Sequence, residues 1–386
     1  GSNSSNVIFR EVFIHGLVLD AQGRKMSKSL GNGIDPIEVI EEYGADTLRF
    51  MLITGNTPGN DLRFQFERLE GARNFCNKIW NASRFALMHL EDLEPGAAPK
   101  GRLELADRWI LSRLNSTVGQ VTYNLEKYEL GEAARELYEY IWSEFCDWYI
   151  ELIKPRLYGK VTPESRKTAQ QVLWYVLSEI LRLLHPFMPF ISEEIWQHLP
   201  HRDGTLMLEK WPEVREELAA PEQEKQMSLV MDVIRTIRNL RAELNVAPGK
   251  KAEVLITANN DLSMGYLQEN LDYIKLLAQA DPVELTLQKT EKPKEALSGV
   301  AGGGVEVFLL FAGLIDVAAE IKRLEKELKA LTAERQKIEA KCNNPGFLAK
   351  APAEVVAKEK GKLAEVQVKE KALKERLAIL DPTSGE

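Results

Sequence analysis

The sequence predicts a mainly α-helical protein that ends in an antiparallel coiled-coil hairpin. Three observations predict this fold class. Apolar residues recur every three or four positions through the middle of the chain, short strand-like runs follow Pro248-Gly249, and two heptad-like stretches flank a Pro/Gly-rich turn near the C-terminus. The 386 residues suffice for two or three domains.

The composition excludes several classes of protein. Hydrophobic residues make up 44% and charged residues 28%, as in ordinary globular proteins. No apolar run approaches the roughly 20 residues that cross a bilayer, so we expect a cytoplasmic protein without membrane contact. Cys76, Cys146 and Cys342 are far apart in the sequence, so we expect no disulfide framework and no protein-bound metal. Because the net charge is −8, any nucleic acid must be bound by local basic patches.

Residues 1–100 are expected to combine short strands with helices. A helix should begin at Pro36, because Asp35 can accept hydrogen bonds from the first-turn amides, and it should end at Gly44. The other expected elements are strand-like runs over residues 7–19, a Gly/Ser/Lys-rich loop over 20–33, helices over 45–54 and 67–90, and a linker at 94–101.

Residues 101–248 have a helical period and predict an antiparallel helical bundle. Pro155 should end one helix, Thr162-Pro163 should start the next, and His185-Pro186 should break it. Ser192 should open another helix, and the last one should span about residues 221–245. Six aromatic residues follow the helical spacing and are assigned to the core rather than to a base-stacking surface. They are Trp142, Trp148, Tyr149, Trp174, Tyr175 and Trp196.

The pattern changes in the last two parts of the chain. Residues 249–313 predict a small α+β unit, with strands at 252–257, 283–287 and 305–311 and one helix at 262–280. In residues 314–386 the apolar seam is interrupted by Arg335, Glu359 and Glu370, and the turn at Asn344-Pro345-Gly346 forbids one continuous helix. Each limb of the resulting hairpin should extend roughly 40 Å, so it must project or meet a partner.

Residues 25–29, Lys-Met-Ser-Lys-Ser, form the most informative motif and are called the signature loop below. Two ammonium groups and two hydroxyl groups among flexible glycines can wrap a phosphate chain. The alternative is a solvated basic loop without a ligand.

The signature loop resembles the second signature of class I aminoacyl-tRNA synthetases, and other segments resemble bacterial valyl-tRNA synthetases. These segments are Tyr43-Gly44-Ala45-Asp46-Thr47-Leu48-Arg49-Phe50, Thr54-Gly55-Asn56-Thr57-Pro58-Gly59-Asn60-Asp61-Leu62-Arg63-Phe64, Trp80-Asn81-Ala82-Ser83-Arg84-Phe85, Phe145-Cys146-Asp147-Trp148-Tyr149, His185-Pro186-Phe187-Met188-Pro189-Phe190 and Asn344-Pro345-Gly346-Phe347-Leu348-Ala349-Lys350-Ala351-Pro352.

The resemblance implies four parts. Residues 1–100 would be the end of a Rossmann-type catalytic domain with stem-contact helices, and residues 101–248 an anticodon-binding domain. Residues 249–313 would be a small α+β subdomain, and residues 314–386 a coiled-coil arm that binds tRNA. The His-Ile-Gly-His signature and the editing domain of the family are not found in this sequence, and His15-Gly16 is no substitute for the former. The isolated chain is therefore expected to be inactive.

The resemblance also implies the chemistry. The family activates valine with ATP, with Mg²⁺ expected in the full-length enzyme, and transfers it to valine tRNA. Lys25 and Lys28 would stabilise the leaving pyrophosphate, and Ser27 and Ser29 would contact ATP phosphates or hold the loop closed.

Basic residues elsewhere suggest tRNA contacts. Arg235, Arg238 and Arg241 recur every three residues on one helix, where they can contact tRNA or form salt bridges with residues such as Asp232. Lys341 and Lys350 lie near the bend of the hairpin and are the preferred contacts of the arm, although ordinary coiled-coil surfaces are also rich in lysine.

Two other functions are compatible with the sequence. The chain can be a non-catalytic RNA-binding or scaffold protein of synthetase ancestry, which predicts no rescue of activity when the upstream part is supplied in trans. Alternatively, the hairpin can be a dimerisation device, which predicts a concentration-dependent mass that is lost when residues 314–386 are deleted.

Overall fold

The computed structural model describes residues 11–54, 59–93, 99, 102–200, 203–288, 293, 295–314, 316–350 and 353–380. The chain divides into two compact units, Gly1–Met227 and Ser228–Glu386, and the boundary falls within one helix. Among the described residues, no helix combines the length and the apolar character needed to cross a bilayer.

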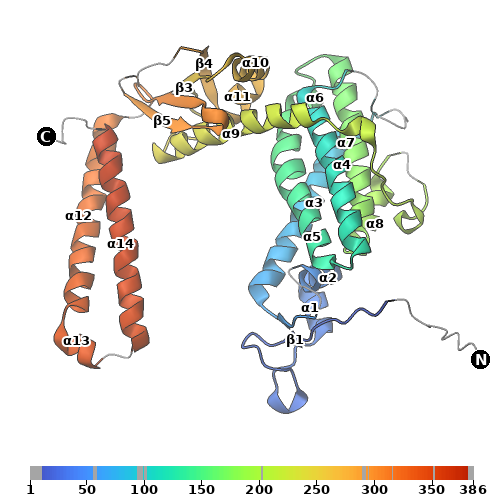
Figure 1. The fold of residues 1–386 in the computed structure, drawn as a ribbon, viewed down its shortest axis with the longest axis horizontal. Coiled ribbons are helices and arrows are strands. Elements are labelled where there is room, and N and C mark those ends of the chain that lie inside the picture. The colour runs from blue at the N-terminus through green and yellow to red at the C-terminus, as the bar shows by residue number, and fades with distance from the viewer. Residues whose placement is uncertain are drawn as a thin grey trace, which may run out of the picture. The chain divides into compact units, whose positions relative to one another are not determined.

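The first unit is a helical bundle with a small loop-rich end, shown in blue to green in Figure 1. Its elements are β1 (Val18–Leu19), η1 (Lys28–Leu30), α1 (Pro36–Tyr43), α2 (Ala45–Ile53), β2 (Leu62–Arg63), α3 (Phe66–Leu90), α4 (Leu105–Glu126), α5 (Leu130–Glu139), η2 (Tyr140–Tyr149), α6 (Ile150–Leu157), α7 (Pro163–Leu184), α8 (Pro189–His198), η3 (Leu206–Leu208) and η4 (Glu216–Leu218).

The helix starts expected from the sequence are found at α1 and α7. The Asp35 side chain accepts a hydrogen bond from the Ile37 amide at 2.8 Å, and Gly44 ends α1 with a φ of 92°. The Thr162 side chain caps α7 in the same way, and Pro163 occupies its first turn. Local side-chain chemistry therefore determines both helix starts.

Three local expectations were wrong. Within the described part of residues 7–19, only Val18–Leu19 form a strand, because β2 pairs with these two residues alone. Pro155 lies inside α6 and does not end it. The helix continues to Leu157, so only two helical residues follow the proline, which lacks a backbone N–H. Helix α8 begins at Pro189 rather than at Ser192, because proline suits the first turn of a helix.

Helices α5, η2 and α6 follow one another without a break, and η2 is a π-helix of ten residues. The core of the bundle includes an ion pair. The Arg156 guanidinium donates to Asp107 at 2.9 Å, and the Tyr149 hydroxyl donates to the same carboxylate at 3.2 Å. The side chains of Arg156 and Asp107 are 3% and 0% exposed. Loss of Arg156 would leave the fully buried carboxylate of Asp107 without its cation, so the core depends on this arginine.

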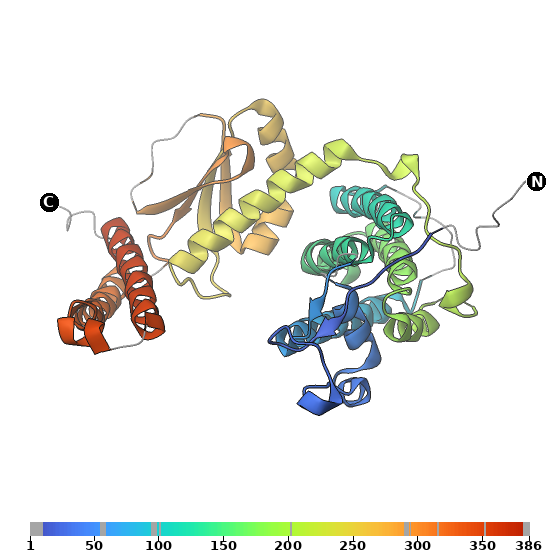
Figure 2. The same cartoon turned by 60° about the horizontal axis from the view of Figure 1, so that its bottom comes forward.

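The second unit begins at Ser228 within α9 (Pro221–Glu243) and contains a four-stranded sheet. Its strand order is β4-β3-β6-β5, with β3 and β4 parallel and the other pairs antiparallel. Figure 2 shows α9 running along the sheet. The contact is close, because a Cβ atom added at Gly299 would lie 2.7 Å from the Thr236 side chain. The elements are β3 (Ala252–Thr257), α10 (Asp261–Glu269), α11 (Leu271–Ala278), β4 (Ala280–Thr286), β5 (Ala296–Val300), η5 (Gly302–Gly304) and β6 (Glu306–Leu310).

The α+β unit differs from the sequence expectation at two places. The single helix expected over residues 262–280 is two helices, α10 and α11, because the Asn270 side chain donates to the Tyr266 carbonyl and ends the first of them. Strand β5 was not predicted, because its sequence Ala-Leu-Ser-Gly-Val has little β-branched character and contains a glycine.

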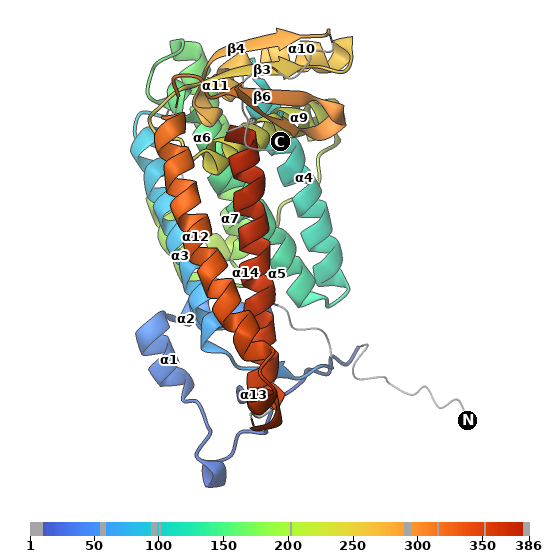
Figure 3. The same ribbon diagram turned by 90° about the vertical axis from the view of Figure 1, so that its left-hand side faces the viewer.

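The predicted hairpin is confirmed. Helices α12 (Val317–Cys342) and α14 (Ala353–Leu380) lie side by side, and the short α13 (Pro345–Lys350) forms the tip (Figure 3). Two of the three polar residues that interrupt the seam pair with each other, and the third, Glu359, pairs with Lys341. Arg335 donates to Glu370 at 2.7 Å, and Lys341 lies 3.1 Å from Glu359. These pairs link the two helices at defined levels, so they specify the register of the hairpin.

Candidate phosphate loop and nucleic-acid groove

The signature loop lies between β1 and α1 and presents two lysines to solvent. Lys25 forms an isolated bridge with Leu19, and Lys28 begins the short helix η1. Both side chains are exposed, and neither has an acidic partner among the residues that the structure describes. The Ser27 and Ser29 hydroxyls lie 3.1 Å apart, and the Ser27 hydroxyl also caps η1. Two unneutralised ammonium groups on one short loop can bind a polyanion.

The backbone of this loop is held by two residues that the sequence analysis missed, Asp20 and Asn32. The Asp20 carboxylate is nearly buried and receives four hydrogen bonds, one of which comes from the Asn32 side chain at 2.8 Å. This bond, together with those from Arg24, lowers the pKa of Asp20 to about 2. Two features of the sequence could have identified these residues. Asp20 directly follows a strand, and Asn32 lies between two glycines, and both are residue types whose side chains organise turns.

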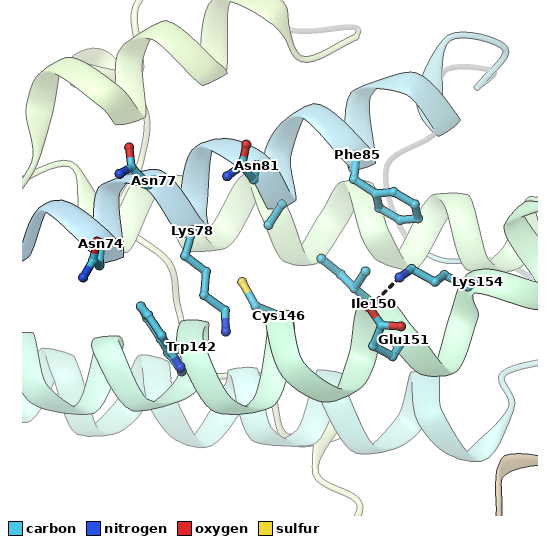
Figure 4. Close-up of a pocket in the computed structure, with 11 residues that line it drawn as sticks. Asn74, Asn77, Lys78, Asn81, Phe85, Trp142, Cys146, Ile150, Glu151 and Lys154 are labelled. Atoms are coloured by element: carbon cyan, nitrogen blue, oxygen red, sulfur yellow. Dashed lines mark hydrogen bonds and ion pairs between the residues drawn. The ribbon is translucent and has the colours of Figure 1, made fainter. Parts of the chain in front are cut away.

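A second site is an open groove of about 480 Å³ in the helical bundle, which we call the α3–α6 groove (Figure 4). Helix α3 contributes amide, basic and aromatic side chains, and η2 and α6 contribute the opposite wall. Its lining residues are Asn74, Asn77, Lys78, Asn81, Ala82, Phe85, Trp142, Cys146, Ile150, Glu151 and Lys154.

Each aromatic ring of the groove lies near a cation. The Lys78 ammonium lies 4.1 Å from the ring centre of Trp142 and also pairs with Asp147. The Lys154 ammonium lies 5.6 Å from the ring centre of Phe85 and 2.5 Å from Glu151. The groove thus combines aromatic rings on which bases can stack with two lysines, each of which is also paired with a carboxylate.

The three asparagines, Asn74, Asn77 and Asn81, all lie on α3 and line the groove (Figure 4). All three are exposed and have no hydrogen-bond partner among the described residues. A carboxamide offers donors and an acceptor side by side and so matches the edge of a nucleobase. The groove can therefore offer hydrogen bonds to base edges beside its aromatic rings.

The π-helix η2 shapes the wall opposite α3. Trp142, Cys146, Ile150 and Lys154 are each four residues apart and all line the groove. In an α-helix with 3.6 residues per turn, such a row drifts around the axis by about 40° per step. In the wider π-helix, a row of residues four apart drifts around the axis in the opposite sense. A π-helical segment followed by an α-helical segment therefore keeps these four side chains close to one line.

The assignment of Trp142 to the core was wrong, because this residue is only half-buried and lines the groove. The other five aromatic residues of that set, at 8% exposure or less, are buried as predicted. Cys146 also lines the groove, and burial raises the pKa of its thiol to about 12. This thiol therefore stays protonated at neutral pH and acts as an apolar part of the wall.

The three arginines of α9 differ in their surroundings. Arg235 pairs with Asp232 at 2.8 Å, as the salt-bridge alternative predicted. Arg238 is exposed, and its guanidinium donates to the Leu277 carbonyl at 2.9 Å. Arg241 is only 7% exposed and donates to the carbonyls of Gln279 and Ala247, both at 3.1 Å. The row is therefore not uniformly exposed, and Arg241 joins parts of the α+β unit.

The tip of the hairpin holds the remaining candidates. Lys341 is partly exposed, lies 5.1 Å from the ring centre of Phe347 and pairs with Glu359. Lys350 is the last residue of α13, and its side chain lies outside the described part of the chain. Among the described residues, no group of three or more His, Cys, Asp or Glu side chains could hold a metal ion.

Comparison with known families accounts for most of the chain. Residues 3–65 match the model "tRNA synthetases class I (I, L, M and V)", residues 107–256 match "Anticodon-binding domain of tRNA ligase", and residues 316–381 match "Valyl tRNA synthetase tRNA binding arm". The signature loop lies in the first match, and the η2–α6 wall of the groove lies in the second.

Curated relatives agree with these models. The chain is 58% identical to a valine–tRNA ligase of Carboxydothermus hydrogenoformans, over 97% of this chain and 42% of that protein. It is 48% identical to valine–tRNA ligases of Oceanobacillus iheyensis and Clostridium acetobutylicum, over 96% and 98% of this chain and 42% and 43% of those proteins. The chain thus spans about two-fifths of the length of these relatives and corresponds to their C-terminal part. On this evidence, the chain belongs to the valine–tRNA ligase family.

Proposed function

We propose that this chain is the tRNA-binding part of a valine–tRNA ligase, a cytoplasmic enzyme that joins valine to its tRNA at the expense of ATP. The observation that carries the proposal is the α3–α6 groove, where three exposed asparagine amides lie beside two aromatic rings and two lysines. Proteins read single-stranded RNA loops by stacking splayed bases on aromatic rings and by hydrogen bonding to their edges. The groove is suited to bases of the anticodon loop.

The signature loop would act on ATP. When the valine carboxylate attacks the α-phosphate, negative charge builds up on the departing pyrophosphate. Lys25 and Lys28 would stabilise that charge, and the Ser27 and Ser29 hydroxyls would donate to phosphate oxygens. The exposed, unneutralised state of both ammonium groups supports this role. A Mg²⁺ ion bound with ATP would supply further positive charge, and no residue of this chain is assigned to it.

The hairpin and α9 would add contacts to the tRNA backbone. Lys341 and Lys350 are proposed at the tip, and Arg235 and Arg238 on α9. Arg241 is a weaker candidate, because its guanidinium is buried and bound to two carbonyl groups. Contacts of this kind strengthen binding without reading sequence, so they should act through the salt-dependent part of the affinity.

The decisive experiment measures binding of valine tRNA and isoleucine tRNA by fluorescence anisotropy across salt concentrations. The groove predicts preference for valine tRNA, lost in an Asn77→Ala/Asn81→Ala variant. Gln268→Ala, which removes an exposed amide on α10, is the matched control and should change nothing. Equal affinity for both tRNAs in the unsubstituted chain would contradict the proposal.

A second assay separates binding from catalysis. The chain covers about two-fifths of its relatives, and we expect the isolated chain to give no ATP–pyrophosphate exchange with valine. Activity should return when the upstream part of a relative is supplied in trans. Failure of that rescue, together with RNA binding that ignores tRNA identity, would favour a non-catalytic RNA-binding protein instead.

A further inference from the structure

The signature loop is tied to a single carboxylate. One oxygen of Asp20 accepts from the backbone amides of Gln22 and Arg24, at 3.1 and 2.7 Å. The other oxygen accepts from the Arg24 side chain and from the Asn32 side chain, both at 2.8 Å. The carboxylate therefore closes the turn that precedes the loop and, through Asn32, reaches the backbone that follows it.

Asn32 carries this connection into the loop itself. Its side-chain oxygen accepts from the Ser27 amide at 3.0 Å, and its side-chain nitrogen also donates to the Lys25 carbonyl at 3.3 Å. The peptide groups on both sides of Met26 are thus fixed by one amide side chain. Only a side chain with both a donor and an acceptor can make this set of bonds.

The arrangement leaves the lysine ammonium groups out of the network. The loop is held by Asp20, Asn32 and main-chain groups, while Lys25 and Lys28 remain exposed without an acidic partner among the described residues. A buried acid beside a cationic loop would ordinarily neutralise one of its lysines. Here the carboxylate is saturated by other donors, so it orders the loop without weakening its charge.

We propose that Asp20 and Asn32 are positioning residues that hold the signature loop in a phosphate-ready conformation before any phosphate binds. This inference rests on the phosphate-binding role proposed for the loop. It assigns no contact with the phosphate to either residue. Their contribution is preorganisation, which reduces the ordering required of Lys25 and Lys28 when the anion arrives.

The substitution Asp20→Asn distinguishes this role from simple electrostatics. Asparagine keeps the size of the side chain and an oxygen for the two backbone amides, but its nitrogen would face the donors of Arg24 and Asn32. Simple electrostatics predicts that removing a negative charge beside the loop strengthens anion binding. Positioning predicts the opposite, and Asn32→Ala should reproduce the loss without changing any charge.

The first test needs no ligand. Trypsin cleavage after Lys25 and Lys28 is followed by mass spectrometry on the complete chain and on the variants Asp20→Asn, Asn32→Ala and Glu38→Gln. Glu38 is an exposed acid on α1 outside the network, so its variant controls for the charge change. We expect about tenfold faster cleavage in the first two variants only, the size associated with one lost charge-assisted hydrogen bond. An unchanged thermal unfolding midpoint confirms that the bundle stays folded. Equal cleavage in all four proteins would overturn the proposal.

The second test uses inorganic tripolyphosphate as the probe, with affinity measured by calorimetry. Asp20→Asn and Asn32→Ala should each weaken binding by about tenfold, in the same direction as Lys28→Ala, whereas Glu38→Gln should not. Unchanged or tighter binding by Asp20→Asn would refute positioning. If the unsubstituted chain binds no tripolyphosphate while the cleavage difference persists, the phosphate role of the loop fails and the ordering role of Asp20 stands.

Discussion

The ammonium group of Lys78 on α3 lies 4.1 Å from the ring centre of Trp142 on η2, across the α3–α6 groove (Figure 4). The pair joins two segments that are distant in sequence. It places the aromatic ring of Trp142, on which a base can stack, next to the cationic side chain of Lys78. If the groove binds RNA, the two residues should make separable contributions.

Substitution of Trp142 by alanine should lower the affinity for valine tRNA by about 1–3 kcal/mol, the value of one base–aromatic stack. The slope of affinity against salt should stay the same, because no charge is lost. Lys78→Met should instead reduce that slope by about one. Anisotropy titrations at several salt concentrations measure both quantities.

Trp80→Ala is the control for this pair. Trp80 lies on the same helix and is 39% exposed, but it does not line the groove. Its removal should leave RNA affinity unchanged. An equal loss for Trp80→Ala and Trp142→Ala would mean that the groove is not the binding site.

Substitution of Arg156 by methionine should destabilise the helical bundle by about 3–5 kcal/mol, because it leaves the buried carboxylate of Asp107 without its cation. Arg135→Met removes an exposed ion pair on α5 and should cost less than about 1 kcal/mol. Chemical denaturation followed by circular dichroism compares the two variants. Similar losses would show that burial does not decide the importance of these pairs.

Substitution of Glu370 by alanine should loosen the hairpin, because Arg335 loses its partner on the other helix and keeps only Glu339 on its own helix. Lys374 also loses its ion pair with Glu370. The double change Arg335→Leu/Glu370→Leu should restore protection, since an apolar pair fits a coiled-coil seam. Hydrogen exchange of peptides from α12 and α14 reports the effect directly. A double variant as unprotected as the single one would contradict an interhelical role for the pair.

The signature loop should keep its fold in mild acid. The pKa of Asp20 is lowered from 3.8 to about 2, so folding favours the charged carboxylate. The contribution of that carboxylate is fully present above pH 4 and is lost as the pH falls from about 4 to about 2. Arg24 is the charged residue bonded to it. Amide resonances of Gln22 and Arg24 should shift with a midpoint near pH 2, where the carboxylate of the folded chain takes up its proton. The shift should be absent in Asp20→Asn, and a midpoint near pH 4 would indicate that the network does not form.

Several features followed from the sequence alone because local chemistry decides them. The capping residues Asp35 and Thr162 specify where their helices begin, and the heptad pattern with its Pro/Gly turn specifies the hairpin. The signature loop and the family resemblance were likewise readable, since both rest on contiguous residues. The polar positions Arg335 and Glu370 were visible as interruptions of the seam, although their pairing was not.

The α3–α6 groove and the Asp20–Asn32 network could be found only in the tertiary structure. Trp142 has helical spacing like its buried neighbours, and only the π-helix and the position of α3 decide that it faces solvent. Asp20 and Asn32 are ordinary turn residues until the chain folds back and brings their side chains within 2.8 Å. A periodic pattern records which residues prefer burial or a turn. It does not record which segment they meet, because that choice depends on packing between residues far apart in the chain.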